Sequence, residues 1–307
     1  MKEDKILIIK FGGLGDIILS LNAIFSIRDK FQKSELILLT EKPYNDFLKK
    51  SNWFDDIVVL KRSLFYFHDI YQLKKKIKIS SVDKVFDLQT SRRTSAYLKL
   101  FTENNIYTNG IGKFAKINHK NPDRNNMHTI TRQKEQLSLS KINLKTNIKL
   151  NWLYNYKRIY KNKIALIVPG GSKKRLNKRI PVQIFSKIID FFISKKIKPI
   201  LIGSKDDFSV CEKLFKAFPS IENLCNKTDF FKVAQLSKQS SISVGNDTGP
   251  MHIIAKGDKP TLVFFTEHSN YNLCGQQGKK VIMMTYEKNN LEFSKQAIEK
   301  IKKVALI

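Results

Sequence analysis

Three glycines and an aspartate stand together near the start of the chain. They lie in the stretch from Phe11 to Asp16, where a hydrophobic run ends and an apolar segment of helical period begins. Glycines at such a junction allow a tight turn and bring backbone amides close to a ligand. The spacing differs from the GxGxxG of dinucleotide folds, and an acid here would repel a pyrophosphate. Asp16 is therefore either the N-cap of a helix or a general base in a cleft between domains.

A second stretch, from Val168 to Pro181, combines glycine, hydroxyl and cationic groups between a strand-like run and a helical segment. Glycine amides, a hydroxyl and several cations just before a helix are suited to bind a diphosphate. The alternative is a solvated basic loop. The residues predicted to hold the diphosphate are Gly170, Gly171 and Ser172 with one of the lysines Lys173, Lys174 and Lys178.

A third stretch, from Val244 to His252, places an acid and a hydroxyl at the start of a helix, directly after a strand. Ligands of open α/β sheets bind at this end of the strands. The alternative is that the acid or the hydroxyl only caps the helix and that the histidine packs against it. The candidate ligand-binding residues of this stretch are Asp247, Thr248, Gly249 and His252.

The elements that must position these residues follow a regular order. Short apolar runs bounded by turns alternate with segments of helical period, which is typical of βαβ units and parallel sheets. In the first half, strands are predicted over residues 5–11, 35–40, 56–60, 82–86 and 106–109, followed by a long loop over 111–130. In the second half, strands are predicted over residues 163–168, 198–202, 241–244 and 261–265.

The segment 143–162 has the pattern of a linker between these two halves. The sequence therefore predicts an α/β protein with two Rossmann-like domains, 1–150 and 151–307, that face each other across a cleft. Apolar residues at three- and four-residue steps predict a closing C-terminal helix over residues 291–304.

Composition narrows the classes of partner. The chain has 307 residues with 56 Lys+Arg against 27 Asp+Glu, a net charge of +29, which suggests an anionic partner. Since no nucleic-acid-binding motif accompanies the charge, and lysine is spread over the whole chain, we do not expect nucleic acid. No run is long enough to span a membrane, and no signal-peptide core is present, so we expect a cytoplasmic protein. The three cysteines are widely separated and predict packing, not a disulfide or a metal site.

The three stretches together resemble the heptosyltransferases, glycosyltransferase family nine, over nearly the whole chain. The residues that carry the resemblance are Ile6 to Lys10 with Gly15 and Asp16, Asp87 to Gln89 with Arg92, Arg93 and Ser95, His128 with Arg132, Pro169 and Gly170 with Lys178, Arg179 and Pro181, and Asp247 to His252. Departures are Asn22 and Ile180, where the family usually has proline and often tryptophan, and Phe264 to His268 where it commonly has Gly-Pro-Thr.

The resemblance implies a GT-B fold and an inverting, metal-independent transfer of a sugar from a nucleotide diphosphate, usually ADP-heptose, to a lipopolysaccharide core. It implies no cofactor. Asp16 would be the general base, Ser172 and Lys178 would hold the diphosphate, and Asp247, Thr248, Gly249 and His252 would line the donor pocket of the C-terminal domain. The alternatives are a non-catalytic sugar-nucleotide-binding protein and a nicotinamide-dependent oxidoreductase, the latter opposed by the missing GxGxxG.

Basic residues of the first half could form the acceptor site. Arg62, Arg92, Arg93, His128 and Arg132 fall after predicted strands or in the long loop, and include four of only nine arginines. Arginine suits bidentate contacts to phosphate or carboxylate. These residues predict a basic wall for an acidic or phosphorylated glycolipid, with peripheral contact to the cytoplasmic face of the inner membrane. The alternative is a solvated basic face.

Overall fold

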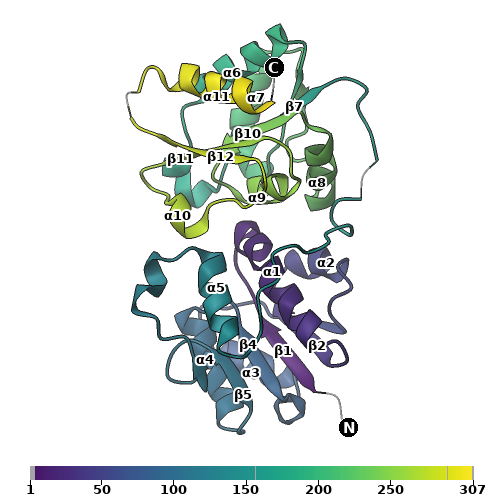
Figure 1. The fold of residues 1–307 in the computed structure, drawn as a ribbon, viewed down its shortest axis with the longest axis vertical. Coiled ribbons are helices and arrows are strands. Elements are labelled where there is room, and N and C mark those ends of the chain that lie inside the picture. Colours follow the sequence, from purple (N-terminus) through teal and green to yellow (C-terminus); the bar gives the residue numbers. More distant parts are fainter. Residues whose placement is uncertain (1–3, 156, 289, 306–307) are drawn as a thin grey trace. The chain divides into compact units, whose positions relative to one another are not determined.

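The structure is a computed structural model that describes residues 4–155, 157–288 and 290–305 (Figure 1). The chain divides into two compact units, Met1–Trp152 and Leu153–Ile307. Each unit contains one six-stranded sheet in which every paired strand runs parallel to its neighbour. Parallel strands must be joined by crossover connections, and helices provide most of them in both units.

The sheet of the first unit has the strand order β3-β2-β1-β4-β5-β6. Its strands are β1 Lys5–Ile9, β2 Glu35–Thr40, β3 Asp56–Val59, β4 Lys84–Asp87, β5 Tyr107–Gly110 and β6 Ile117–Asn118. The four residues of β1 after Lys5 are all fully buried. A continuous apolar strand is what a parallel sheet covered on both faces requires.

Helices cover both faces of this first sheet. They are α1 Leu14–Lys30, α2 Tyr44–Lys49, α3 Tyr66–Lys76, α4 Arg92–Thr102 and α5 Thr129–Ser138, with short 3-10 helices η1 Ile79–Ser81 and η2 Pro122–Asn126. Val85 of β4 packs with the buried side chains of α3 and α4. Its neighbour Phe86 meets Phe31, at the end of α1. Because side chains alternate along a strand, α1 lies on the face opposite α3 and α4, and α5 packs beside α1.

The second unit repeats the architecture with the order β12-β11-β10-β7-β8-β9. Its strands are β7 Ile164–Val168, β8 Lys198–Leu201, β9 Glu222–Asn223, β10 Ile242–Asn246, β11 Thr261–Thr266 and β12 Val281–Tyr286. Its helices are α6 Val182–Ser194, α7 Phe208–Ala217, α8 Phe230–Gln239, α9 Gly249–Lys256, α10 Tyr271–Cys274 and α11 Phe293–Ala305, with η3 Lys173–Lys178 and η4 Lys205–Asp207. α6, α7 and α11 bury one core with the sheet, and α8 packs against α9.

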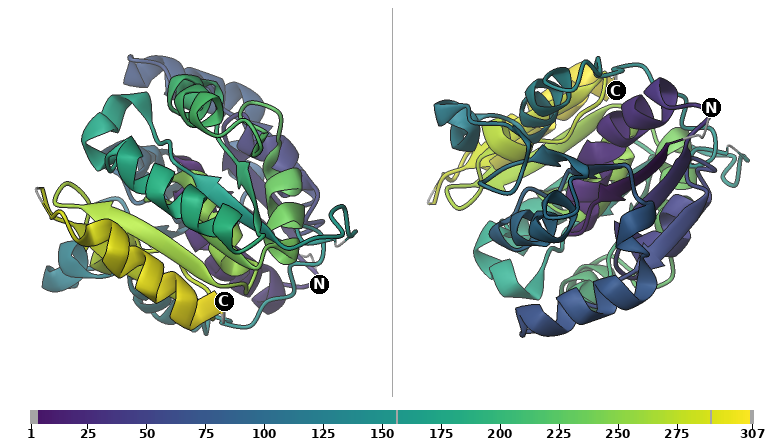
Figure 2. Two further views of the ribbon diagram at one scale, coloured as in Figure 1. Left: turned by 90° about the horizontal axis from the view of Figure 1, so that it is seen from above. Right: turned by 90° about the horizontal axis from the view of Figure 1, so that it is seen from below.

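The two parallel sheets confirm the predicted α/β class. The closing helix is α11, which packs beside α6 through Phe293, Ala297 and Ile301 (Figure 2). The sequence prediction was wrong in three details. The strands β9 and β12 were not predicted, and the expected loop over 111–130 contains β6, η2 and the start of α5. No described helix combines the length and the apolar composition that crossing a membrane requires.

Candidate active site

The first glycine-rich stretch forms the turn between β1 and α1. Gly12 has a φ of 105°, a conformation that favours glycine, and Gly13 is the N-cap residue of α1. Asp16 is the third residue of the helix, and its Oδ2 accepts a hydrogen bond from the Gly13 amide at 3.3 Å. The prediction that Asp16 is the N-cap residue was therefore wrong, because Gly13 is the N-cap and Asp16 lies three residues later. The carboxylate of Asp16 remains exposed.

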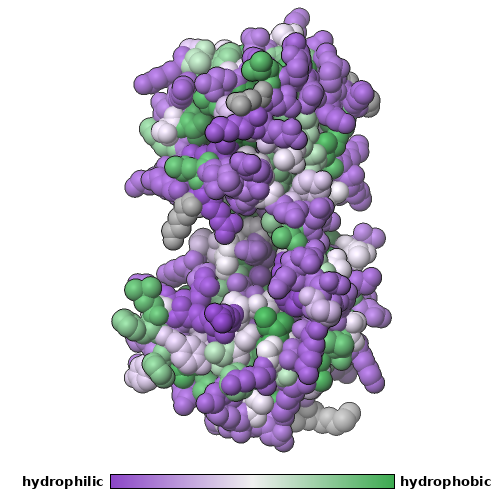
Figure 3. Space-filling view, turned by 90° about the vertical axis from the view of Figure 1, so that its left-hand side faces the viewer, coloured by the Kyte–Doolittle hydropathy of each residue, from purple (hydrophilic) through white to green (hydrophobic). Residues whose placement is uncertain are grey.

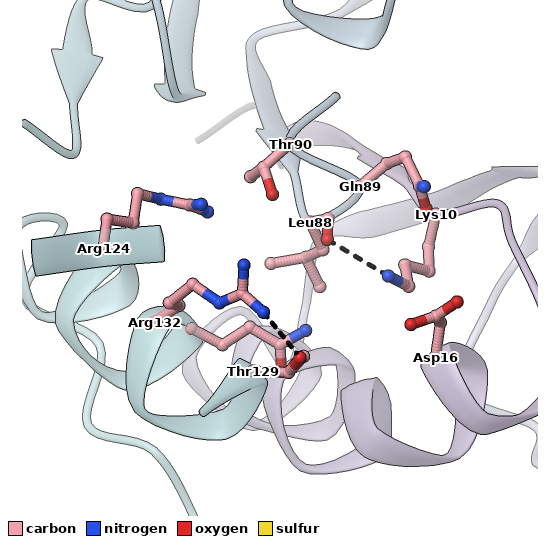
Figure 4. A pocket seen from close by; sticks show the side chains of 9 residues that line it. Lys10, Asp16, Leu88, Gln89, Thr90, Arg124, Thr129 and Arg132 are labelled. Carbon is pink, nitrogen blue, oxygen red and sulfur yellow. Dashed lines mark hydrogen bonds between the residues drawn. The ribbon is translucent and has the colours of Figure 1, made fainter. Parts of the chain in front are cut away.

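A polar cavity of about 160 Å³ opens at the carboxyl ends of β1 and β4 (Figure 4). Lys10 and Asp16 line it from the β1 side, while Arg124 and Arg132 reach it from η2 and α5. The remaining lining residues are Leu88, Gln89, Thr90, Thr129 and Gln133. The cavity thus brings one exposed carboxylate together with three basic side chains.

Burial and charge shape the electrostatics of this cavity. Burial lowers the pKa of Lys10, while the carboxylates of Asp16 and Asp87 act in the opposite direction. Nζ of Lys10 donates to the Leu88 carbonyl at 3.4 Å. Burial also lowers the pKa of Arg124, and the like charge of Arg132 contributes to this shift. The two guanidinium groups therefore repel each other, and an anion bound between them would reduce this repulsion.

Hydrogen bonds fix the frame of the cavity. Gln133 of α5 donates to the Ser20 hydroxyl at 2.7 Å, and that hydroxyl donates to the carbonyl of Asp16 at 2.7 Å. Gln136 donates to the carbonyl of Asp87 at 2.9 Å. Asp87 is fully buried, which raises its pKa to about 6 even though the amides of Gln89 and Thr90 donate to its carboxylate. α5 is thereby attached to both α1 and β4.

Of the predicted acceptor residues, Arg132 alone lines this cavity within the described part of the chain. Arg62 makes a two-pronged contact to Glu41, with Nε and a terminal nitrogen 3.0 and 2.6 Å from the carboxylate oxygens. Nε of Arg93 lies 2.7 Å from Oδ2 of Asp69, a carboxylate that is fully buried. These two arginines have structural partners of their own, and their acceptor role stays a prediction.

The other two members of the predicted basic wall lie at helix starts. Arg92 is exposed at the first position of α4. His128 is the N-cap residue of α5, where its Nδ1 accepts a hydrogen bond from the amide of Ile130 at 3.2 Å. His128 therefore has a structural function, and its acceptor role also stays a prediction.

In the second unit, Gly170 and Gly171 form a loop that Asp207 holds in place. The Gly171 amide donates to Oδ1 of Asp207 at 2.7 Å, and Arg179 donates to the same oxygen at 3.1 Å. A side chain at Gly170 would bring its Cβ to 2.1 Å from Cγ of Asp207. Gly170 is therefore required by close packing, and Asp207 is occupied by the loop itself.

Lys178 and Asp247 join the second and third sequence stretches. Nζ of Lys178 lies 2.8 Å from Oδ2 of Asp247, and the two side chains are only 16% and 5% exposed. Gln276 donates to the other oxygen of Asp247 at 3.0 Å. Lys173 is far more exposed, at 68%, and lies 3.5 Å from Asp206, while the side chain of Lys174 lies outside the described residues. Lys178 is therefore not part of a solvated basic loop. Lys173 and Ser172 are exposed, as that alternative predicts.

The third stretch leads from β10 into α9. Thr248 is the N-cap residue of α9, but its side chain makes no capping hydrogen bond, and Gly249 is the first helical residue. His252 is 5% exposed within the helix. Asp247 does not cap the helix, because its carboxylate is bound to Lys178 and Gln276. The predicted residues of the two loops thus meet in one place through Asp247.

Sequence reasoning missed four polar residues of these sites. Asn246 is 1% exposed and donates to the carbonyls of Pro169 and Gly170 at 2.7 and 3.1 Å, which ties β10 to the glycine loop. The other three are Lys10, Arg124 and Gln276. Asn246 could have been found from its position directly before Asp247, whereas Arg124, in η2, and Gln276, after α10, stand in segments without a motif.

The chain matches the model of glycosyltransferase family 9 (heptosyltransferase) over residues 70–303. It belongs to this family and is a glycosyltransferase with a GT-B fold. The search of curated proteins found no match.

Solved structures show the same fold along the whole chain. The glycosyl transferase family 9 protein from Veillonella parvula superimposes with a TM-score of 0.79 at 18% identity, covering 100% of this chain and 99% of that one. ADP-heptose lps heptosyltransferase II of E. coli gives 0.74 at 14% identity, with 98% of each chain covered. The E. coli heptosyltransferase WaaC with ADP gives 0.75 at 16% identity, covering 96% of this chain and 99% of that one.

Proposed function

We propose that this glycosyltransferase transfers a heptose from ADP-heptose to an acidic or phosphorylated glycolipid of the lipopolysaccharide type, with inversion at the anomeric carbon and without a metal ion. The first unit binds the acceptor and the second binds the donor. WaaC has been solved with ADP and with ADP-2-deoxy-2-fluoro heptose, which supports this choice of donor. In this proposal, the enzyme carries out the transfer at the cytoplasmic face of the inner membrane.

The observation that carries this proposal is the exposed carboxylate of Asp16 in a cavity with Lys10, Arg124 and Arg132. Asp16 accepts the proton of an acceptor hydroxyl while the hydroxyl oxygen attacks the anomeric carbon. The bond between that carbon and the diphosphate oxygen breaks, and ADP leaves. The two arginines hold anionic groups of the acceptor, which relieves their mutual repulsion.

The second unit supplies the proposed donor site. Gly170, Gly171 and Ser172 offer amides and a hydroxyl to the diphosphate, and Lys178 neutralises charge on the leaving group. Asp247, Thr248, Gly249 and His252 line the sugar-nucleotide pocket. The ion pair of Lys178 with Asp247 supports this assignment, because it fixes a partly buried cation at the loop that was singled out for the diphosphate.

The test is the variant Asp16→Asn. An amide oxygen can still accept the hydrogen bond from Gly13, so we expect an unchanged melting temperature and unchanged donor affinity. An amide cannot take up the proton, so release of ADP in the presence of acceptor should fall by roughly 100-fold or more. Asp46→Asn, in the first turn of α2, is the matched control and should keep full turnover.

Three outcomes would contradict parts of the proposal. Near-normal turnover by Asp16→Asn would remove Asp16 as the base. Tight ADP-heptose binding by the unaltered protein with no ADP release on any acceptor would instead indicate a sugar-nucleotide-binding protein. Loss of activity in EDTA that magnesium restores would contradict transfer without a metal ion.

A further inference from the structure

Four large apolar side chains are exposed within eight residues of the first unit. Leu64 is 97% exposed, Phe65 75%, Phe67 82% and Tyr71 64%, and we call these four residues the 64–71 patch. The other exposed large hydrophobic side chains of the described residues are scattered along the chain at Leu139, Ile159, Leu176, Ile193, Phe208, Tyr271 and Leu291. Single exposed apolar residues are ordinary, whereas a gathering of them marks an interaction surface.

The fold explains why the 64–71 patch points outward. α3 turns Asp69 and Leu73 toward the protein, where Leu73 joins the core and Asp69 meets Arg93. Phe67 and Tyr71 stand four residues apart, so they share the opposite face of the helix. Most of the surface visible in Figure 3 is hydrophilic, and apolar side chains are a minority on that face of the protein.

Positive charge accompanies the patch. Lys74, Lys75 and Lys78 are exposed one to two turns after Tyr71, and Lys61 is exposed just before the patch. Asp69 is the single acid between residues 61 and 78, and its charge is matched by Arg93. Apolar and aromatic side chains beside a row of lysines are the composition of a helix that lies on an anionic bilayer.

The patch is connected to the proposed reaction site through Arg62. Its loop follows β3, so it leaves the sheet at the same edge at which Asp16 follows β1. Arg62 joins the two places, because it binds Glu41, and Glu41 accepts a hydrogen bond from the amide of Gly12 at 3.2 Å. The guanidinium of Arg62 also lies 5.0 Å from the centre of the Phe11 ring. A surface held at this edge would meet an acceptor that is anchored in lipid.

We propose that the 64–71 patch is the membrane-docking surface, which inserts its apolar side chains into the interface of an anionic bilayer while the neighbouring lysines contact lipid headgroups. The choice of a bilayer as partner rests on the proposed function, in which the acceptor is a glycolipid. The patch then sets which edge of the first unit faces the membrane.

The test is co-sedimentation of the full chain with vesicles of phosphatidylglycerol and phosphatidylethanolamine, compared with phosphatidylcholine vesicles. We expect binding to the anionic vesicles alone. Leu64→Ser combined with Phe67→Ser should weaken that binding by about tenfold or more, because both side chains lose their burial in the bilayer. Leu291→Ser combined with Phe208→Ser removes the same two residue types from exposed positions of the second unit and should leave binding unchanged.

A second pair of variants tests the charge. Replacing Lys74, Lys75 and Lys78 with glutamine should weaken binding to anionic vesicles severalfold and reduce its dependence on salt. The same change at three exposed lysines of the second unit, Lys216, Lys300 and Lys303, alters net charge equally and should have less effect. Equal losses from both triple variants would overturn the assignment of the charge to this surface.

Two further results would overturn the proposal as a whole. One is equal vesicle binding by the unaltered protein and the Leu64→Ser, Phe67→Ser variant. The other is concentration-dependent dimerisation in sedimentation velocity that this variant abolishes, which would assign the patch to a second copy of the chain. Since vesicle binding does not depend on turnover, inactivity of the protein on ADP-heptose would refute the proposed function without deciding this test. The patch variant should keep full turnover on acceptor dissolved in detergent.

Discussion

Lys178 and Asp247, which are 69 positions apart in the chain, form an ion pair of 2.8 Å that joins the loop after β7 to the loop after β10. Both side chains are largely shielded from water, so removing one partner costs more free energy than breaking an exposed pair. The pair distinguishes Lys178 from Lys173, because the side chain of Lys173 is mostly exposed. The pair therefore supports the proposal that Lys178 is the lysine that binds the diphosphate.

Lys178→Ala should weaken donor binding at least tenfold, because a charge-assisted contact to the diphosphate is lost. It should also lower the free energy of unfolding by about 1–3 kcal/mol, since Asp247 keeps only its hydrogen bond from Gln276. Lys173→Ala is the matched control and should change neither quantity appreciably. Isothermal titration with ADP and chemical denaturation measure the two effects. Stronger loss of ADP binding from Lys173→Ala would reverse the assignment.

Two adjacent glycines should respond differently to the same substitution. Gly170→Ala would place its Cβ 2.1 Å from Cγ of Asp207, whereas Cβ of Gly171→Ala would come no closer than 3.8 Å, to the Arg179 side chain. We expect Gly170→Ala to cost about 1–3 kcal/mol of stability and to weaken donor binding. Gly171→Ala should cost less than about 1 kcal/mol.

Thermal unfolding of the two variants with and without ADP checks this prediction. Displacement of Asp207 would release the Gly171 amide and Arg179 together, because both donate to its Oδ1. Similar melting temperatures for the two variants would show that the loop relaxes around the extra methyl group.

The fold could be predicted well because its signals are local. The buried residues of β1 and β7 form continuous apolar runs, β10 is buried over its whole length, and glycines or polar residues mark where each strand ends. β12 was not predicted although Val281 to Met284 form an apolar run, and its place at the edge of the sheet is fixed by pairing with β11. Local composition carries no information about that partner.

The site could be predicted only in part, for a related reason. Asp16, Gly170 and Asp247 stand at strand ends, where the topology of a parallel sheet brings ligands. The partners of the arginines depend on tertiary contacts, so the sequence could not indicate that Glu41 holds Arg62 or that Asp69 holds Arg93. Lys10 belongs to the opening motif of the resemblance but was given no role in the site, because its sequence position does not show that its side chain is buried against the cavity.

The buried Asp87 should give the protein a measurable pH dependence. Its pKa is raised from 3.8 to about 6 in the folded state, mainly by burial. The folded protein therefore keeps a proton that the unfolded chain releases, and this contribution to stability is lost as the pH rises from about 4 through 6. The corresponding change in the free energy of unfolding is about 3 kcal/mol.

Asp87→Asn isolates this effect because an amide does not titrate. Between pH 4 and pH 7, the free energy of unfolding of the unaltered protein should fall relative to that of the variant. Urea denaturation at several pH values measures it. A difference that stays constant over this range would show that Asp87 ionises at its ordinary pKa.

The arginines of the first unit should separate into structural and acceptor-binding groups. Arg93→Ala leaves the buried carboxylate of Asp69 without its ion pair, so we expect a loss of about 3 kcal/mol in the free energy of unfolding. Arg92 is exposed, and Arg92→Ala should change stability by less than about 0.5 kcal/mol. In a variant that removes both arginines, a loss of stability could therefore not be told apart from a loss of acceptor binding.

Arg132 gives the sharper test of the acceptor site, because it lines the cavity beside Asp16. Arg132→Ala should raise the KM for the acceptor by about tenfold or more, through loss of a charge-assisted hydrogen bond, and leave the KM for the donor unchanged. Arg132→Lys keeps the charge but not the two-pronged geometry, so it should restore only part of the affinity. An acceptor dependence that is the same in all three proteins would mean that the acidic groups of the acceptor bind elsewhere.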